Sequence, residues 1–137
     1  MKTMILIPAL APGAELIDYL QALSDAQLGQ LVVVDDGSGP DYAPIFALAA
    51  QIPGCTVLRY QGKFNFSRIN NFGRAHAKGE YLLMLNNDVE IINPDWLTEM
   101  LMQASRPGAA ICGAMLYYAD DTIQHAGIIT GLGGYAG

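Results

Sequence analysis

The sequence predicts an α/β fold in which a mostly parallel β-sheet carries helices on both of its faces. Short, wholly apolar runs alternate along the chain with segments whose apolar residues recur at helical spacing. The apolar runs lack alternating polar residues, which is typical of parallel strands buried on both faces. Glycine, proline, asparagine and aspartate residues gather between these segments and indicate turns.

The first half of the chain contains the clearest elements. Residues 4–7 form a short apolar strand that Pro8 ends. An amphipathic helix follows, with apolar residues at Leu16, Ile17, Leu20 and Leu23. Residues 31–34 predict a second strand, which leads directly into the turn-forming residues 35–40.

The pattern continues through the middle of the chain. We expect a helix over residues 41–50 and a third strand over residues 56–58. A helix over residues 67–77 is predicted next, with Ser67 as its N-cap and Gly79 beyond its end. Residues 81–85 predict a fourth, buried strand.

The last third of the chain is less regular. Asn93 and Pro94 indicate a helix start, and its inner side is formed by Trp96, Leu97, Met100 and Leu101. Residues 109–115 predict a fifth strand, and residues 122–130 allow another. Because the chain then closes in a glycine-rich run, we expect the fold to be incomplete at its C-terminal end.

Length and composition predict one globular domain over residues 1–137, because the chain has 137 residues of which 52% are apolar and 15% are charged. The formal net charge of -6 argues against nucleic acid or an anionic membrane surface as the main partner. Any bound phosphate must therefore be held locally, by a cation or by backbone amides.

The cysteines and the apolar runs predict a cytoplasmic chain without a membrane span. Cys55 and Cys112 match no metal-binding or redox spacing, so we interpret them as reduced thiols. Pro8 interrupts the first apolar run too early for a signal peptide. No apolar run reaches the roughly 18 to 20 residues that a spanning helix needs.

Two polar clusters directly follow predicted strands. In an open parallel sheet the ligand crevice lies beyond the carboxyl ends of the strands, so these clusters are the candidate site. The first cluster, after the second strand, is Asp35, Asp36, Gly37 and Ser38. The second, after the fourth strand, is Asn86, Asn87 and Asp88.

The paired acids of the first cluster are suited to a nucleoside. Two adjacent carboxylates cost energy unless hydrogen-bond donors or a cation compensate them, and a base imide N–H and ribose hydroxyls are such donors. Gly37 would let the backbone approach a ligand closely. The alternative, an ordinary turn with helix-capping acids, explains Asp-Gly-Ser equally well when this cluster is taken alone.

Asp88 is the candidate metal ligand of the second cluster. Mg²⁺ and Mn²⁺ prefer oxygen donors and share their coordination shell with water and substrate phosphates. A cation at Asp88 would stabilise the charge on a departing nucleoside diphosphate. The alternative is that the cluster only forms a turn before the helix that starts near Asn93, and without the first cluster this alternative is preferred.

Other polar and aromatic residues have weaker claims. Solvated surface charge is the preferred interpretation of Lys63, Arg68 and Arg74, although one of them could approach a phosphate. His76 and His125 are interpreted as structural. The large aromatic residues are assigned to the core, namely Phe64, Phe66, Phe72 and Trp96.

Two long segments carry a family resemblance. The sequence contains VVVDDGS and, further on, INNFGRAHAKGEYLLMLNNDVEIINPDWL. These segments resemble glycosyltransferase family 2, whose fold is the Rossmann-like GT-A fold, and the second is similar to rhamnosyltransferase-like members. The resemblance covers nearly the whole chain, and its motifs occur in family order at family spacing.

The resemblance implies a nucleotide-sugar site and assigns residues to it by position. Its nucleotide-sugar-binding residues are Pro8, Ala9, Asp35, Asp36, Gly37, Ser38, Asn71, Asn86 and Asn87, and its metal ligand is Asp88. Asn86 stands where the family's DxD motif has its first acid. Ala11 stands where Asn is usual, and Asn70 where Arg is common.

The implied activity is transfer of a sugar, with inversion, from a dTDP- or UDP-linked donor to a glycan acceptor of polysaccharide biosynthesis, assisted by Mn²⁺ or Mg²⁺. The chain would be the N-terminal part of a longer catalytic domain, and its catalytic residues stay unassigned. The first sixty residues resemble another branch of the family, so a recombined or designed chain is an alternative origin. A non-catalytic nucleotide-binding or scaffold module is the alternative function.

A phospho-receiver domain is a further alternative, because it also places paired acids after a parallel strand and binds Mg²⁺. Against it, the acids here follow the second strand, and no Asp ends the third.

Overall fold

A computed structural model describes residues 3–27, 29–127, 130–132 and 135–136. The chain divides into two compact units, Met1–Glu90 and Ile91–Gly137, and each is described by itself. A single domain over the whole chain stays a prediction.

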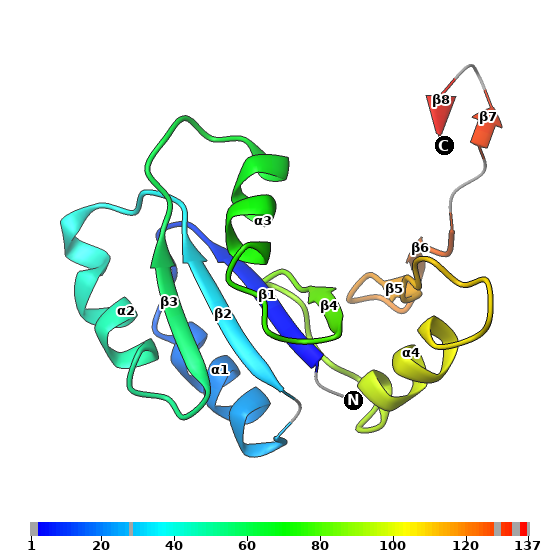
Figure 1. Cartoon of the computed structure of the whole chain (residues 1–137), viewed down its shortest axis with the longest axis horizontal. Helices are drawn as coiled ribbons and strands as arrows, with labels where there is room; N and C mark the ends of the chain where they lie inside the picture. The colour runs from blue at the N-terminus through cyan, green and yellow to red at the C-terminus, as the bar shows by residue number, and fades with distance from the viewer. Residues whose placement is uncertain (1–2, 28, 128–129, 133–134, 137) are drawn as a thin grey trace. The chain divides into compact units, whose positions relative to one another are not determined.

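The first unit is built on a parallel sheet (Figure 1). Its strands are β1 (Thr3–Ala9), β2 (Gln30–Asp35), β3 (Cys55–Arg59) and β4 (Tyr81–Met84), in the order β3-β2-β1-β4. All three neighbouring pairs are parallel. The predicted strands and the predicted parallel sheet are therefore confirmed, with strand ends that differ by a few residues.

Helices cover both faces of this sheet. Helix α3 (Phe66–Arg74) packs on β1 and β2, whereas α1 (Glu15–Asp25) lies behind the sheet and packs on β2 and α2 (Ala43–Ala49) (Figure 1). The helix predicted over residues 41–50 is divided, because a 3₁₀ turn, η1 (Pro40–Tyr42), precedes α2. The α/β class with helices on both faces is confirmed.

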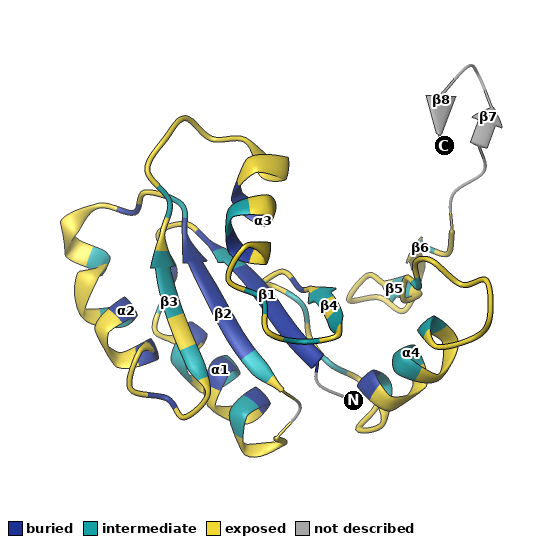
Figure 2. Ribbon diagram, in the orientation of Figure 1, coloured by how far each residue is buried: buried dark blue, intermediate teal, exposed yellow. Residues whose placement is uncertain are grey.

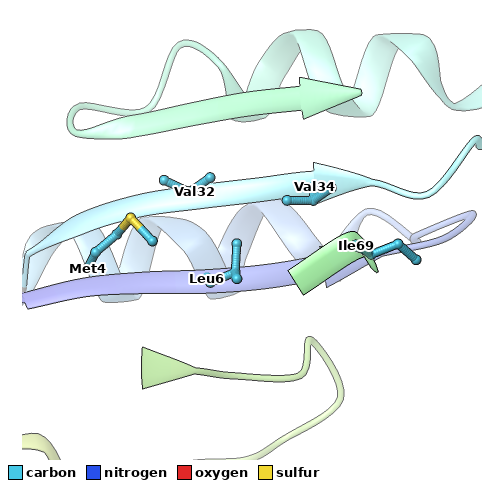
Figure 3. Packing of buried hydrophobic residues seen from close by; sticks show 5 residues of the cluster. All are labelled: Met4, Leu6, Val32, Val34 and Ile69. Atoms are coloured by element: carbon cyan, nitrogen blue, oxygen red, sulfur yellow. The ribbon is translucent and has the colours of Figure 1, made fainter. Parts of the chain in front are cut away.

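One part of the core lies between α3 and the two central strands. Met4, Leu6, Val32 and Val34 project from the same face of β1 and β2 and pack with Ile69 of α3 (Figure 3). Figure 2 shows β1 and most of β2 buried. Full burial of an aliphatic side chain of this size contributes roughly 1.5 to 3 kcal/mol, so this cluster holds α3 against the sheet.

Gly73 allows α3 to lie close to the sheet. A Cβ atom at this position would meet Leu6 Cδ1 at much less than van der Waals distance and would lie 2.9 Å from Val34 Cγ2. Both neighbours belong to the buried cluster and have little room to move. Glycine is therefore required here by the close approach of helix and strand.

Two local predictions in this unit are wrong. The N-cap of α3 is Asn65 and not Ser67, because the Asn65 side chain accepts a hydrogen bond from the Arg68 backbone N–H at 2.9 Å. The fourth strand is not fully buried, since Leu82 and Met84 are exposed. Helix α3 packs on β1 and β2, whereas β4 is the edge strand of the sheet beside β1.

The second unit contains helix α4 (Trp96–Ala104) and two short antiparallel pairs. Strand β5 (Leu116–Tyr117) pairs with β6 (Ile123–His125), and β7 (Thr130–Leu132) pairs with β8 (Tyr135–Ala136). Residues 109–115 form no strand, so that prediction is wrong. A strand needs a partner for its backbone groups, and pairing here begins only at Leu116.

The predicted strand over residues 122–130 is realised in part, by β6 and the first residue of β7, while residues 128 and 129 lie outside the described residues. Within the part of the chain that the structure describes, no helix is both long enough and apolar enough to cross a bilayer.

Candidate functional site

A hollow of about 310 Å³ opens in the first unit where the strands β1, β2 and β4 end. Its walls come from the end of β1, the turns after β2 and β4, and the start of α3. The lining residues are Pro8, Ala9, Leu10, Asp36, Phe64, Phe66, Ile69, Asn86, Asn87 and Asp88. The carboxyl edge of a parallel sheet is the expected place for a ligand, and the volume is at the lower end of the range for small-molecule sites.

Asp35 and Asp36 point to opposite faces of the sheet. Successive side chains of a strand alternate, and Val32 and Val34 face α3. Asp36 therefore lies on the α3 side, where it lines the hollow, while Asp35 lies on the other side. The structure brings Asp36 and Asp88 to one hollow and engages Asp35 elsewhere.

Asp35 is buried and fully engaged. One carboxylate oxygen accepts a hydrogen bond from the Ser38 backbone N–H at 2.8 Å, and the other lies 3.3 Å from Arg59 Nη1. Arg59 Nη2 also donates to the Ser38 carbonyl at 2.9 Å. These contacts compensate the buried charge and close the turn after β2. Asp35 therefore fixes the backbone of this turn and does not line the hollow.

Ser38 and Gly37 contribute through the backbone. Ser38 is buried, and its Oγ accepts a hydrogen bond from the Ala11 N–H at 2.9 Å, which ties the loop after β1 to the turn after β2. Ala11 and Gly37 have φ of 46° and 75°. This left-handed region favours glycine, so Ala11 carries local strain, and the Ser38 hydrogen bond helps to hold it there.

Asp36 keeps its carboxylate available. Its backbone N–H donates to the Ala9 carbonyl at 2.9 Å, which fixes the residue beside the end of β1. Partial burial, and secondarily the neighbouring Asp35 charge, raise the pKa of Asp36. A carboxylate in this position is suited to accept hydrogen bonds from a ligand.

The Leu85 N–H donates to the Leu6 carbonyl at 2.9 Å directly before the turn after β4, and the turn itself has one long side-chain contact among the described residues. The Tyr19 hydroxyl, from α1, lies 3.5 Å from the Asn86 carbonyl and is oriented to donate to it. Burial, and secondarily the Asp88 charge, raise the pKa of Tyr19 to about 12, so its hydroxyl keeps its proton at neutral pH. The side chains of Asn86, Asn87 and Asp88 line the hollow, as the sequence predicted for this cluster.

Asn71 lies apart from the buried side of α3. It is exposed, whereas the lining residues from α3 are Phe66 and Ile69. Its neighbour Asn70 is buried, and its Nδ2 donates to the Phe66 carbonyl at 2.8 Å. The Asn70 Oδ1 atom has no hydrogen-bond partner among the described residues.

Sequence reasoning missed the apolar half of the hollow. Leu10, Phe64 and Ile69 line it together with Phe66, and Phe64 and Phe66 are exposed rather than core residues. Their assignment to the core is therefore wrong. Their position was the available signal. Phe64 lies before the N-cap of α3 and Phe66 is its first residue, whereas the buried residues of the helix start at Ile69.

The hollow offers oxygen donors but no complete protein cage for a metal ion. Within residues 3–27, 29–127 and the two short C-terminal stretches, no group of three or more His, Cys, Asp or Glu side chains is arranged to hold one. Asp88 and the two asparagine amides provide hard oxygen donors on one wall. This set fits a cation that takes its remaining ligands from a bound diphosphate and water.

A family model provides the decisive comparison. The model described as glycosyl transferase family 2 matches residues 5–129, which is most of the chain. The chain belongs to glycosyl transferase family 2. This membership decides against the phospho-receiver alternative and agrees with the motifs around Asp35 and Asp88.

Two curated proteins are similar to this member of glycosyl transferase family 2. The uncharacterized protein y4gI of Sinorhizobium fredii is 41% identical over 143 residues, covering 96% of this chain and 16% of that protein. The O-antigen biosynthesis protein RfbC of Myxococcus xanthus is 36% identical over 141 residues, covering 96% of this chain and 11% of that protein. The chain thus spans only a small part of the length of either relative.

Solved structures confirm the GT-A fold class. The crystal structure of residues 1–349 of S. aureus TarS has a TM-score of 0.58 and 22% sequence identity. The match covers 76% of this chain and 32% of that chain. At this level of identity the likeness concerns the fold alone.

Proposed function

We propose that this chain binds the nucleoside diphosphate sugar donor of a metal-dependent, inverting glycosyltransferase. The observation that carries the proposal is that Asp36 and Asp88, which follow different strands, line the same hollow at the carboxyl edge of the sheet. A carboxylate for hydrogen-bond donors of the ligand and a carboxylate for a cation are therefore available on one surface. Family membership supports this use of the hollow.

Asp36 is assigned to the base and ribose. Its carboxylate is an acceptor, and uracil and thymine present an imide N–H that such an acceptor binds, whereas cytosine has no N–H at the equivalent ring nitrogen. Pro8 and Ala9 form the adjacent wall at the end of β1. TarS, which shares the fold, has been crystallised with UDP-GlcNAc and with UDP, which supports a uridine or thymidine donor.

Asp88 is assigned to the cation and, through it, to the diphosphate. The formal charge of -6 repels a free diphosphate, so a local positive charge favours its binding. Mg²⁺ is usually held by one or two carboxylates together with substrate phosphates, and Asp88 provides one of them. When bound, Mn²⁺ or Mg²⁺ stabilises the negative charge of the leaving nucleoside diphosphate. The amides of Asn86 and Asn87 can donate hydrogen bonds to the phosphate or sugar oxygens.

In the full reaction an acceptor hydroxyl attacks the anomeric carbon of the donor, and the bond to the nucleoside diphosphate breaks with inversion at that carbon. RfbC, 36% identical over 141 residues, acts in O-antigen biosynthesis, which supports a cell-surface glycan as acceptor. We assign the donor site to this chain and leave the general base unassigned. A cytoplasmic location is part of the proposal.

The test is calorimetric titration of the whole 137-residue chain with UDP, dTDP, GDP and CDP, with and without Mn²⁺. We expect UDP or dTDP to bind more tightly than CDP, and Mn²⁺ to increase the affinity at least tenfold. Asp36→Asn should reduce the preference over CDP, because an amide can accept the imide N–H of uracil through its oxygen and can donate its own N–H to the ring nitrogen of cytosine. Equal affinity for every nucleotide, unaffected by metal, would falsify the proposed function.

Asp88→Asn should remove the effect of Mn²⁺ on UDP affinity while leaving the free energy of unfolding unchanged, because Asp88 is exposed. Glu80→Gln is the matched control, since Glu80 is an exposed acid directly before β4, at the opposite end of that strand. If the two variants bind UDP and Mn²⁺ alike, Asp88 is not the metal ligand.

A further inference from the structure

Two exposed phenylalanines stand at the entrance to helix α3. Phe64 is 73% exposed and Phe66 is 57% exposed, although phenylalanine is among the residue types most often buried. Figure 2 shows the first turn of α3 as exposed, in contrast to the buried strands beneath its later residues. A cluster of exposed large apolar side chains at a concave site indicates a binding surface.

The backbone around both residues is fixed. Asn65, between them, caps α3 by accepting the Arg68 N–H at 2.9 Å, and its own carbonyl accepts the Ile69 N–H at 3.0 Å. The Phe66 carbonyl accepts a hydrogen bond from Nδ2 of the buried Asn70 at 2.8 Å. Because these bonds fix the backbone from Asn65 onward, the exposure of the Phe66 ring is built into the first turn, and Phe64 directly precedes the fixed cap.

Both phenylalanines line the same hollow as Asp36 and the turn after β4. One part of that hollow is apolar, formed by Phe64, Phe66, Ile69 and the end of β1, and the other part is polar. A ligand that fits has a flat apolar portion joined to a polar, anionic one. A nucleotide has this composition, and the face of a base stacks on aromatic side chains without regard to its hydrogen-bonding edge.

The loop after β1 offers no aromatic ring for this contact, since its residues are Leu10, Ala11 and Pro12. We infer that Phe64 and Phe66 form the platform on which the nucleobase of the donor stacks, so that the segment entering α3 supplies the affinity for the base face. This inference rests on the proposed function and adds the residues that contact the ring. Asp36 accepts a hydrogen bond from the edge of the base, and the two phenylalanine rings stack on its face.

A purely structural role would predict something different. Phe64 precedes the N-cap and Ile69 is the fourth helical residue, which is the spacing of a hydrophobic staple that stabilises a helix start. A hydrophobic staple would involve Phe64 and would not explain the exposure of Phe66. It also predicts a loss of stability without a specific effect on ligands that contain a base.

The test compares UDP with inorganic pyrophosphate, both in the presence of Mn²⁺, for the whole chain and for Phe64→Leu and Phe66→Leu. Leucine keeps an apolar side chain and removes the flat ring. We expect UDP to bind about five- to 150-fold more weakly to at least one variant, from the range for base stacking on aromatic residues. Pyrophosphate binding should stay unchanged, and Tyr at the same position should restore UDP binding.

A second readout does not depend on affinity. Nuclear Overhauser contacts between phenyl protons and the H5 and H6 protons of bound UDP should be present in the unsubstituted chain and weakened in the Leu variants. Leu48→Ala is the control for loss of an exposed apolar side chain, because Leu48 is 51% exposed on α2 and does not line the hollow. This control should bind UDP normally.

The outcomes separate the inference from the function on which it rests. If UDP binds and neither Leu variant changes its affinity, the stacking platform is overturned and the donor site stands. If both variants lose UDP and pyrophosphate equally, the residues are structural and the platform is likewise overturned. If the unsubstituted chain binds no UDP with Mn²⁺ present, the proposed function fails, and the inference fails with it.

Discussion

The two acidic turns that border the hollow are held very differently. The turn after β2 is fixed by hydrogen bonds from Ser38 to Asp35, from Arg59 to Ser38 and from Ala11 to Ser38, all between 2.8 and 2.9 Å. The turn after β4 has the Tyr19 contact of 3.5 Å to Asn86. The site therefore combines a preorganised wall beside Asp36 with a wall at Asp88 whose side chains keep their hydrogen-bonding capacity for a ligand.

This difference agrees with the assignment of the two walls. Recognition of a base edge depends on a rigid acceptor, because a rigid partner avoids the cost of ordering on binding. A cation and a diphosphate bring strong charges of their own and can order the groups that bind them. The comparison predicts that substitutions of the engaged residues Asp35 and Ser38 affect folding, whereas substitutions of Asp36 and of residues around the second turn affect binding.

The largest expected effect is in the first turn. Asp35→Asn should lower the free energy of unfolding by about 1 to 2 kcal/mol, mainly because a neutral amide oxygen accepts the buried Ser38 N–H more weakly, while the loss of the pair with the half-exposed Arg59 adds little. Urea unfolding measures this loss. The neighbouring Asp36→Asn should change stability by less than about 0.5 kcal/mol. Equal losses in the two variants would contradict the distinction between an engaged and an available acid.

Features of this arrangement that rest on a sequence pattern several residues long could be predicted from the sequence. The apolar runs that became β1 to β4 were recognisable because a buried parallel strand excludes polar residues over several positions. The opposite directions of Asp35 and Asp36 also follow from strand alternation, given that β2 continues through Asp35. The sequence-based expectation that both acids share one pocket ignored this alternation.

Other features depended on partners distant in the sequence. Residues 109–115 are apolar enough for a strand, but Ile111 is 92% exposed and the segment is unpaired in the structure.

The N-cap of α3 was placed at Ser67 because serine is a good cap, although Asn65 is an equally good one two residues earlier. Composition also assigned Phe64 and Phe66 to the core, and only their geometry places them at the hollow.

A smaller effect is expected at the second turn. Tyr19→Phe removes the hydroxyl that lies 3.5 Å from the Asn86 carbonyl. A long, partly exposed hydrogen bond contributes little, so the free energy of unfolding should fall by no more than about 0.5 kcal/mol. The affinity for UDP with Mn²⁺ should fall by no more than about twofold by calorimetry, since a free-energy change of about 0.5 kcal/mol corresponds to roughly this factor. A stability loss as large as that of Asp35→Asn would show that both turns are rigidly held.

A separate effect is confined to alkaline pH and comes from the ionisation of Tyr19 and Cys55. Burial raises the pKa of Tyr19 from 10.0 to about 12 and that of Cys55 from 9.0 to about 11. Between pH 9 and 12 the unfolded chain therefore releases protons that the folded chain keeps, so the free energy of unfolding falls as pH rises. Below pH 9 these two groups cause no pH dependence. Urea unfolding across this range measures the slope, and Tyr19→Phe combined with Cys55→Ala should reduce it.

Gly73 has a consequence for the far end of its helix. The missing side chain at this position lets α3 settle onto Leu6 and Val34, and Phe66 is two turns away on the same helix. The position of the first turn of α3 relative to the strand ends therefore depends on the absence of a side chain at residue 73. A single methyl group at residue 73 would tilt or lift α3, and the displacement would reach Phe66 at the hollow roughly 10 Å along the helix.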